Sequence, residues 1–139
     1  MGDIEQIPAA DEFGAPEIPF ELRRESACLV ALGVRPMALL GRCADADESV
    51  RIRLYHLLES ARTQIYESEK VISFVLPVPG GVLDYGYARQ PWVVEFYRWV
   101  EYHAPSRQAD RARGLLFGYA PCAIQAHEDR NTGAYWDDA

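Results

Sequence analysis

The sequence has little that would cross-link the chain or anchor it in a membrane. It contains three cysteines, Cys28, Cys43 and Cys122, and no Cys-x-x-Cys pair. An odd number of widely spaced cysteines argues against a disulfide framework and favours reduced thiols. The longest apolar runs, residues 28–32 and 75–79, are far shorter than the roughly 20 residues that span a bilayer, and the acidic N-terminus lacks the basic start of a signal peptide. We therefore expect a cytoplasmic protein that does not insert into a membrane.

Motifs for catalysis and for cofactors are missing as well. The chain has no Walker, Rossmann, Gly-x-Ser-x-Gly or His-Glu-x-x-His pattern. The closest pair of metal-ligating residue types is Cys122 with His127, five residues apart. On a helix these two side chains would point about 140° apart, which does not suit a shared ion. We therefore predict neither a metal nor a cofactor.

Positive charge is scarce, and the acidic excess lies at the ends of the chain. The formal net charge is −7, from 21 acidic and 14 basic side chains. Residues 1–25 carry −5 and residues 137–138 carry −2, so residues 26–136 are balanced. A nucleic-acid-binding surface needs a basic stripe, and a DNA mimic needs dense carboxylates on folded elements. The body of the chain favours neither, and a nucleic-acid-related role, as partial DNA mimicry by the acidic end, is a lesser alternative.

Length and composition fit one domain preceded by an irregular arm. At 139 residues, of which 49% are hydrophobic, the chain can bury a single core. The first 19 residues hold three prolines and two glycines without sustained periodicity. We predict an acidic, mobile arm over residues 1–19 and one compact domain over residues 20–139.

The stretch around Gly33 and Pro36 allows two interpretations. Glycine and proline are typical turn residues, so the apolar runs beside them predict a hairpin of residues 27–32 with residues 37–42. The alternative is a helix over residues 20–32, because this run consists of good helix formers with a single β-branched valine. We place the hairpin first and keep the helix as the variant.

The clearest predicted element is an amphipathic helix over residues 50–65. Asp45 and Glu48, three residues apart, form a capping box ahead of it. Its aliphatic side chains recur at helical spacing within an arc of about 100°, as in a helix that turns one face to a core. These side chains are Val50, Leu54, Leu57, Leu58, Ala61 and Ile65.

The opposite face of this helix carries residue types that are common in protein contacts. It presents two tyrosines, an isoleucine, a glutamate and an arginine at spacings of three or four residues. Tyrosine and arginine are enriched at interface centres, while an ordinary solvated face is the alternative. We predict that this face binds another protein, or a second copy of the chain, through Ile52, Tyr55, Glu59, Arg62 and Tyr66.

Residues 71–76 and 82–87 predict a β-hairpin. The first segment is β-branched, aromatic and almost wholly apolar, and the second alternates in part. Between them lies Pro-Val-Pro-Gly-Gly, a strong turn signal. Because proline has no N–H for a sheet ladder, we expect these prolines at a strand end or on an edge strand.

Pro91 and Pro105 bound a helix that is crowded with aromatic residues. Proline is favoured at the first position of a helix, and a second proline ends it. The apolar side chains share one side within an arc of about 120°, which predicts a core stripe, with an exposed aromatic platform as the alternative. The predicted core stripe is Trp92, Val93, Phe96, Trp99, Val100 and His103.

Two short helices are predicted in the C-terminal part. Ser106 is a typical N-cap for a helix over residues 107–117, and Gly118 is a typical residue after its end. The second helix covers residues 121–128. Together these elements predict a small α+β domain, in which one or two antiparallel β-hairpins pack against the two main amphipathic helices. If the first hairpin is helical, the protein is mostly α.

For function, the missing catalytic constellation and the surplus of aromatics favour a small non-catalytic protein-binding module. An inhibitor, an adaptor or an antitoxin-like regulator, of the kind encoded on mobile elements or phages, fits this description. The alternative is a small hydrolase or transferase with a pocket near Asp84 and His103. Asp84 is the catalytic candidate because it is an acid within an apolar strand, and His103 because it ends the aromatic helix.

Overall fold

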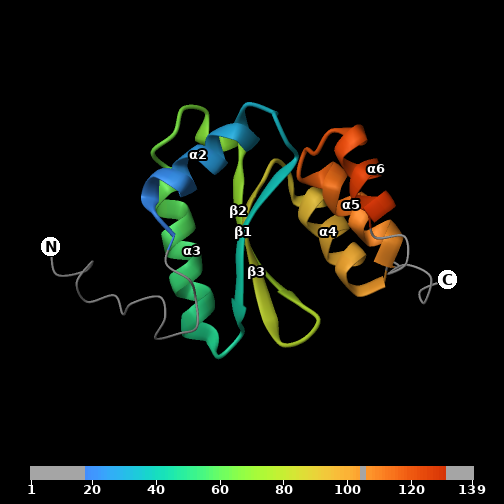
Figure 1. The fold of residues 1–139 in the computed structure, drawn as a ribbon. Helices are drawn as coiled ribbons and strands as arrows, with labels where there is room; N and C mark the ends of the chain where they lie inside the picture. The colour runs from blue at the N-terminus through green and yellow to red at the C-terminus, as the bar shows by residue number, and fades with distance from the viewer. Residues whose placement is uncertain (1–17, 104–105, 131–139) are drawn as a thin grey trace, which may run out of the picture.

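The sheet at the centre of the fold has three antiparallel strands in the order β1-β3-β2 (Figure 1). The computed structural model describes residues 18–103 and 106–130. The predicted arm, residues 1–19, therefore lies almost entirely outside the described residues. The elements are α2 (Phe20–Ala31), β1 (Met37–Ala44), α3 (Glu48–Arg62), the short 3-10 helix η2 (Ser68–Lys70), β2 (Ile72–Val78), β3 (Val82–Ala88), α4 (Pro91–His103), α5 (Ser106–Leu116) and α6 (Pro121–Arg130).

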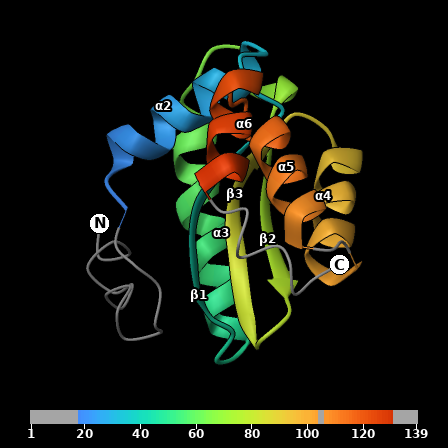
Figure 2. The same ribbon diagram turned by 45° about the vertical axis from the view of Figure 1, so that its right-hand side comes forward.

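Helices α2 and α3 lie on one face of the sheet, and α4, α5 and α6 lie on the other (Figure 1, Figure 2). This arrangement confirms the predicted α+β single domain. None of the helices in the described segments is long and apolar enough to cross a bilayer. Each face of the sheet has its own core: one includes Val30, Leu54, Leu58, Leu83 and Tyr87 below α2 and α3, and the other includes Met37, Phe74, Leu76, Val93 and Tyr97 below α4.

The predicted hairpin of residues 27–32 with residues 37–42 is wrong, because the first of these segments is helical. The alternative helix over residues 20–32 is the one that forms, as α2. Gly33 has φ of 79°, and the next amide donates to the carbonyl of Leu29 at 3.0 Å, which is a Schellman ending. The glycine that suggested a β-turn thus ends a helix whose residues have high helix propensity.

The hairpin predicted for residues 71–76 and 82–87 is confirmed as β2 and β3. The strands pair antiparallel as far as Val78 opposite Val82, so three residues form the loop. Both glycines of this loop have positive φ, a conformation that other residues rarely adopt. The Pro-Gly-Gly sequence therefore suits this tight connection.

Helix α3 confirms the amphipathic helix predicted over residues 50–65, although it ends earlier, at Arg62. Its N-cap is Asp47, whose side chain accepts a hydrogen bond from the Ser49 amide at 2.9 Å. The predicted capping box of Asp45 with Glu48 is therefore wrong. Asp47 directly precedes the first helical residue, so its carboxylate lies over the first-turn amides.

Helix α4 forms where it was predicted, but it turns a different face to the core. The side chains of Trp92, Phe96, Trp99 and His103 are exposed. The prediction that they belong to the core is wrong, and the alternative of an exposed aromatic face is the one that the structure bears out. The buried side chains are Val93, Tyr97 and Val100.

A buried carboxylate explains the rotation of α4. Asp84 on β3 has no exposed surface. Arg42 from β1 binds its two oxygens at 2.5 and 2.8 Å, and the Tyr97 hydroxyl donates to it from α4. Phe96, on the face that was predicted to be buried, has no hydroxyl with which to make that bond. A hydrogen bond to a charged group contributes about 1.5–3 kcal/mol, so the bond to Asp84 favours the rotation that turns Tyr97 inward.

Helices α5 and α6 confirm the two short helices predicted over residues 107–117 and 121–128. Gly118 has φ of 80°, and the next amide donates to the carbonyl of Gly114 at 2.8 Å. This is the αL conformation expected of a residue that ends a helix. The Tyr97 and Phe117 rings lie 6.0 Å apart, so aromatic contact joins α5 to α4.

Candidate functional site

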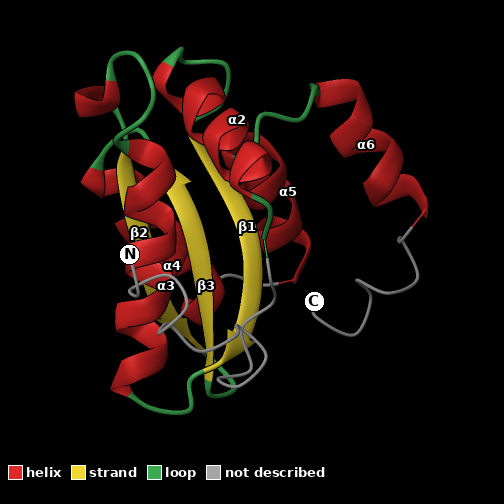
Figure 3. Cartoon of the chain, turned by 90° about the vertical axis from the view of Figure 1, so that its left-hand side faces the viewer, coloured by secondary structure: helices red, strands yellow, loops and turns green. Residues whose placement is uncertain are grey.

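The outer edge of β2 is the first component of the site. Within the described residues β2 pairs with β3 and with no other strand (Figure 3). The Asp45 amide donates to the Gly81 carbonyl, and the Arg89 amide donates to the Pro36 carbonyl. Gly81 and Arg89 flank β3 and are both odd-numbered, so the N–H and C=O groups of the odd-numbered residues of β3 point toward β1. Because the peptide groups of an antiparallel strand bond on alternate sides, its even-numbered residues bond to β2.

This alternation determines where the peptide groups of β2 point. Phe74 lies opposite Gly86, and even-numbered residues of β2 consequently bond to β3. The peptide groups of Ser73, Val75 and Pro77 point outward, away from the sheet. Pro77 has no N–H to leave unpaired there, which explains a proline within a strand and confirms that the hairpin places it on an edge.

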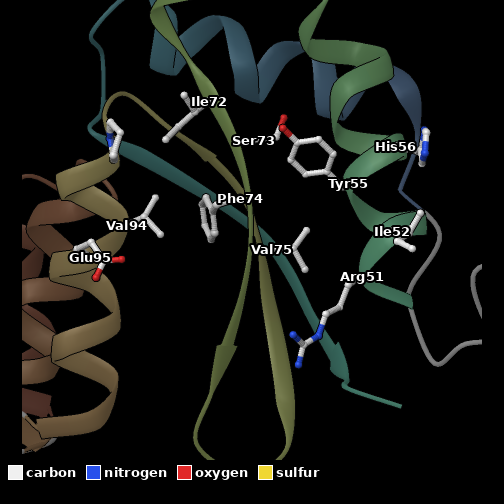
Figure 4. Close-up of a pocket in the computed structure, with 11 residues that line it drawn as sticks. Arg51, Ile52, Tyr55, His56, Ile72, Ser73, Phe74, Val75, Val94 and Glu95 are labelled. Carbon is white, nitrogen blue, oxygen red and sulfur yellow. The ribbon is translucent and has the colours of Figure 1, made fainter. Parts of the chain in front are cut away.

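A groove of about 550 Å³ runs along this free edge, between α3 and α4 (Figure 4). Residues 72–75 of β2 form its floor. Val75 packs toward the core below α3, while Ile72 and Phe74 pack toward the core below α4. The walls consist of Arg51, Ile52, Tyr55 and His56 from α3 and of Pro91, Val94 and Glu95 from α4.

The lining of the groove is mainly apolar. Ile52 and Tyr55 are 53% and 49% exposed, and Figure 4 shows them on the α3 side of β2. Val94 and Phe74 lie on the α4 side. Apolar side chains on both sides of an open strand edge offer surface that a bound molecule would remove from water.

Charged groups beside the groove are already paired within the chain. Arg51 binds Asp45 at 2.6 Å. Glu59 accepts bonds from Arg62 at 2.6 and 2.8 Å, and from the Ser73 hydroxyl at 2.6 Å. The Arg62 guanidinium holds the pKa of the Glu59 carboxyl below its usual value, so the pair is ionised at neutral pH. These bonds tie β2 to α3 and hold the groove wall in position.

The structure separates the five residues predicted for partner binding into three groups. Ile52 and Tyr55 lie in the groove wall. Glu59 and Arg62 form the half-buried pair behind it, and Arg62 also donates to a carbonyl of the turn that precedes β2. Tyr66 lies beyond the end of α3 and is 89% exposed. The predicted face therefore includes one wall of the groove.

The two catalytic candidates are not brought together in an accessible pocket. Asp84 is fully buried, and Arg42 and Tyr97 engage its carboxylate. His103 is exposed on the last turn of α4, beside the rings of Trp99 and Tyr102. A carboxylate in this position holds β1, β3 and α4 together and has no surface to offer a substrate. Across the described segments, His, Cys, Asp and Glu side chains form no group of three that could hold a metal ion.

The sequence did not predict that residues 72–75 and α4 would form the floor and the second wall of a groove. Residues 72–75 were predicted as one strand of a hairpin, but that prediction does not show which helices flank the strand. The proline at position 77 indicated a strand end or an edge strand, but not that a groove runs along this edge. Val94 gave no comparable signal, since the predicted core stripe placed other residues of α4 inward.

No family model matches the chain, and neither a curated protein nor a solved structure matches it.

Proposed function

We propose that this chain is a small non-catalytic protein-binding module, an inhibitor, adaptor or antitoxin-like regulator, that contacts its partner through the groove between α3 and α4. The observation that carries this proposal is an apolar groove along a strand edge with outward-pointing peptide groups. Such an edge can pair with another chain, and natural proteins usually cover or disrupt it when it has no partner. A functional interface accounts for an edge that no described residue covers, between two apolar walls.

The chemistry of the groove also favours binding over catalysis. Its acid and base candidates, His56 and Glu95, lie on opposite walls, and Arg51 is engaged by Asp45. A catalytic site needs an acid, base or nucleophile placed at a reacting atom. The groove instead provides tyrosine, isoleucine, phenylalanine and valine, which supply contact area.

The test is affinity capture from the native host lysate with matched tyrosine variants. Tyr55 in the groove wall and Tyr102 on α4 are 49% and 47% exposed. Replacing either one with alanine therefore removes a similar amount of exposed tyrosine surface from the free chain. Tyr55→Ala should lose a stoichiometric protein partner that the wild type and Tyr102→Ala both retain. Equal melting temperatures of the two variants would show that the loss is not due to unfolding.

Retention of the same partner by Tyr55→Ala, with loss in Tyr102→Ala, would contradict the groove as the interface. It would point instead to the exposed aromatic face of α4.

A further inference from the structure

We infer that one extended segment of the partner fills the groove and adds to the sheet as a fourth strand beside β2. This inference rests on the proposed protein-binding function and specifies what the groove recognises. The occupant is a single stretch of peptide in β conformation, without helices of its own over the contact. Three properties of the groove support this choice: hydrogen-bonding groups that no described residue engages, the position of α3 and α4 on the edge strand, and apolar walls.

The free hydrogen-bonding groups match a strand. Ser73 and Val75 each point an N–H and a C=O outward, and Pro77 adds a C=O. A neighbouring strand can pair with all five of these groups. A helix lying in the groove would bury them without partners, at a cost of about 1–3 kcal/mol for each group. The edge therefore selects an extended backbone.

The position of α3 and α4 on the edge strand argues against a second copy of the chain. Of the three strands, both α3 and α4 pack most on β2, the edge strand itself, and they flank it on its two sides (Figure 1). Adjacent strands lie about 4.8 Å apart, whereas packed helices need about 8–10 Å between their axes. If a second copy paired through its own β2, its α3 and α4 would be brought too close to those of the first. A bare segment of peptide meets no such obstacle.

The walls define the side chains that the segment should carry. In a sheet, side chains of neighbouring strands point to the same face where they lie opposite each other. A side chain of the bound segment that lies opposite Val75 would point toward Tyr55 and Ile52. One that lies opposite Phe74 would point toward Val94. Because both directions are apolar, the segment should be a nearly continuous apolar run, as in strands buried on both faces. Its length should be about five to seven residues, because the outward-pointing groups extend from residue 73 to residue 77 and β2 itself has 7 residues.

The experiment selects peptides without assuming a partner. A phage-displayed library of random linear peptides is panned against the full-length chain, and the enriched sequences are synthesised. We expect a run of Val, Ile, Leu, Phe or Tyr, with binding weakened about tenfold or more by Tyr55→Ala and unchanged by Tyr102→Ala.

A second pair of variants separates backbone recognition from side-chain contact. Val75→Pro removes the outward N–H without removing a bond to β3, as Pro77 does naturally, while Val75→Ala keeps the N–H and removes the side chain. If a strand pairs here, Val75→Pro should weaken the selected peptide about tenfold more than Val75→Ala. Residue-resolved amide exchange in the complex should show new protection at Ser73 and Val75.

Several results would overturn the inference. It fails if panning enriches no peptide, if the enriched peptides are amphipathic helices, or if they leave the Ser73 and Val75 amides unprotected. A chain that sediments at twice 15.7 kDa with those amides already protected would assign the edge to a second copy instead. If any of these occurs while Tyr55→Ala still loses a protein partner from lysate, protein binding stands and strand addition fails. If the capture also fails, both proposals fall.

Discussion

At the scale of single residues, buried polar side chains explain what hydrophobic patterning missed. Asp84 was expected to be a catalytic candidate, yet its ion pair with Arg42 and its bond from Tyr97 make it a structural residue. The same carboxylate favours burial of the α4 face that carries Tyr97. The spacing of apolar residues along a helix does not show that a tyrosine is buried because its hydroxyl bonds to a carboxylate on another element.

Two neighbouring tyrosines on β3 provide a matched test of buried hydroxyl groups. The Tyr87 hydroxyl donates to the Leu58 carbonyl at 2.6 Å, whereas the buried Tyr85 hydroxyl has no partner among the described residues. Tyr87→Phe should lower the free energy of unfolding by about 1–2 kcal/mol, and Tyr85→Phe should change it by about 0.5 kcal/mol or less or raise it. Denaturant unfolding of both variants measures the difference. Equal losses would contradict the assignment of the bond to Tyr87.

The pair of Glu59 with Arg62 predicts a dependence of stability on pH. Hydrogen bonding to Arg62 lowers the pKa of Glu59 in the folded state, so the pair stabilises the fold above the unfolded pKa of about 4.3. This contribution is lost as the pH falls through the folded pKa. Glu59→Gln should therefore be about 1 kcal/mol less stable than wild type at pH 7, with the difference shrinking below about pH 4.

Urea unfolding from pH 7 to pH 3 measures this convergence. A difference that is constant across the range would contradict the ionic origin of the stabilisation.

At the scale of elements, local sequence predicted most helices and strands, and tertiary contacts determined the rest. The helix around Leu54, the hairpin and the boundaries of α4 follow from periodicity, turn residues and prolines, all of which act within a few residues. The segment before Gly33 was assigned to a strand because a glycine after an apolar run suits either a turn or a helix end. The pairing of β1 with β3, which joins residues 38 to 51 positions apart, leaves no local signal.

The exposed aromatic face of α4 leads to a prediction about stability that is opposite to the one made from the sequence. Trp99 is 52% exposed, while the adjacent Val100 is 2% exposed. Trp99→Ala should lower the free energy of unfolding by less than about 1 kcal/mol, and Val100→Ala by about 2 kcal/mol, although tryptophan is far the larger side chain. Thermal and denaturant unfolding of the two variants provide the comparison. A larger loss for Trp99→Ala would restore the predicted core stripe.

At the scale of the whole molecule, the groove arises from how two layers of helices meet the sheet edge. Neither α3 nor α4 forms the groove by itself, and β2 would be an ordinary edge strand without them. One wall could be predicted, because Ile52 and Tyr55 stood out on the face of α3 opposite its core stripe. The groove itself could not, since it depends on the strand order β1-β3-β2 and on α3 and α4 flanking the same strand.

The most direct test of the account is residue-resolved amide hydrogen exchange along β2 in the isolated full-length chain. The account predicts alternation: Phe74 and Leu76, bonded to β3, should exchange slowly, and Ser73 and Val75, facing the free edge, should exchange quickly at every protein concentration. Slow exchange at Ser73 and Val75 in the absence of a partner would contradict the account. It would mean that another part of the chain, or a second copy, already covers the edge on which the proposed function depends.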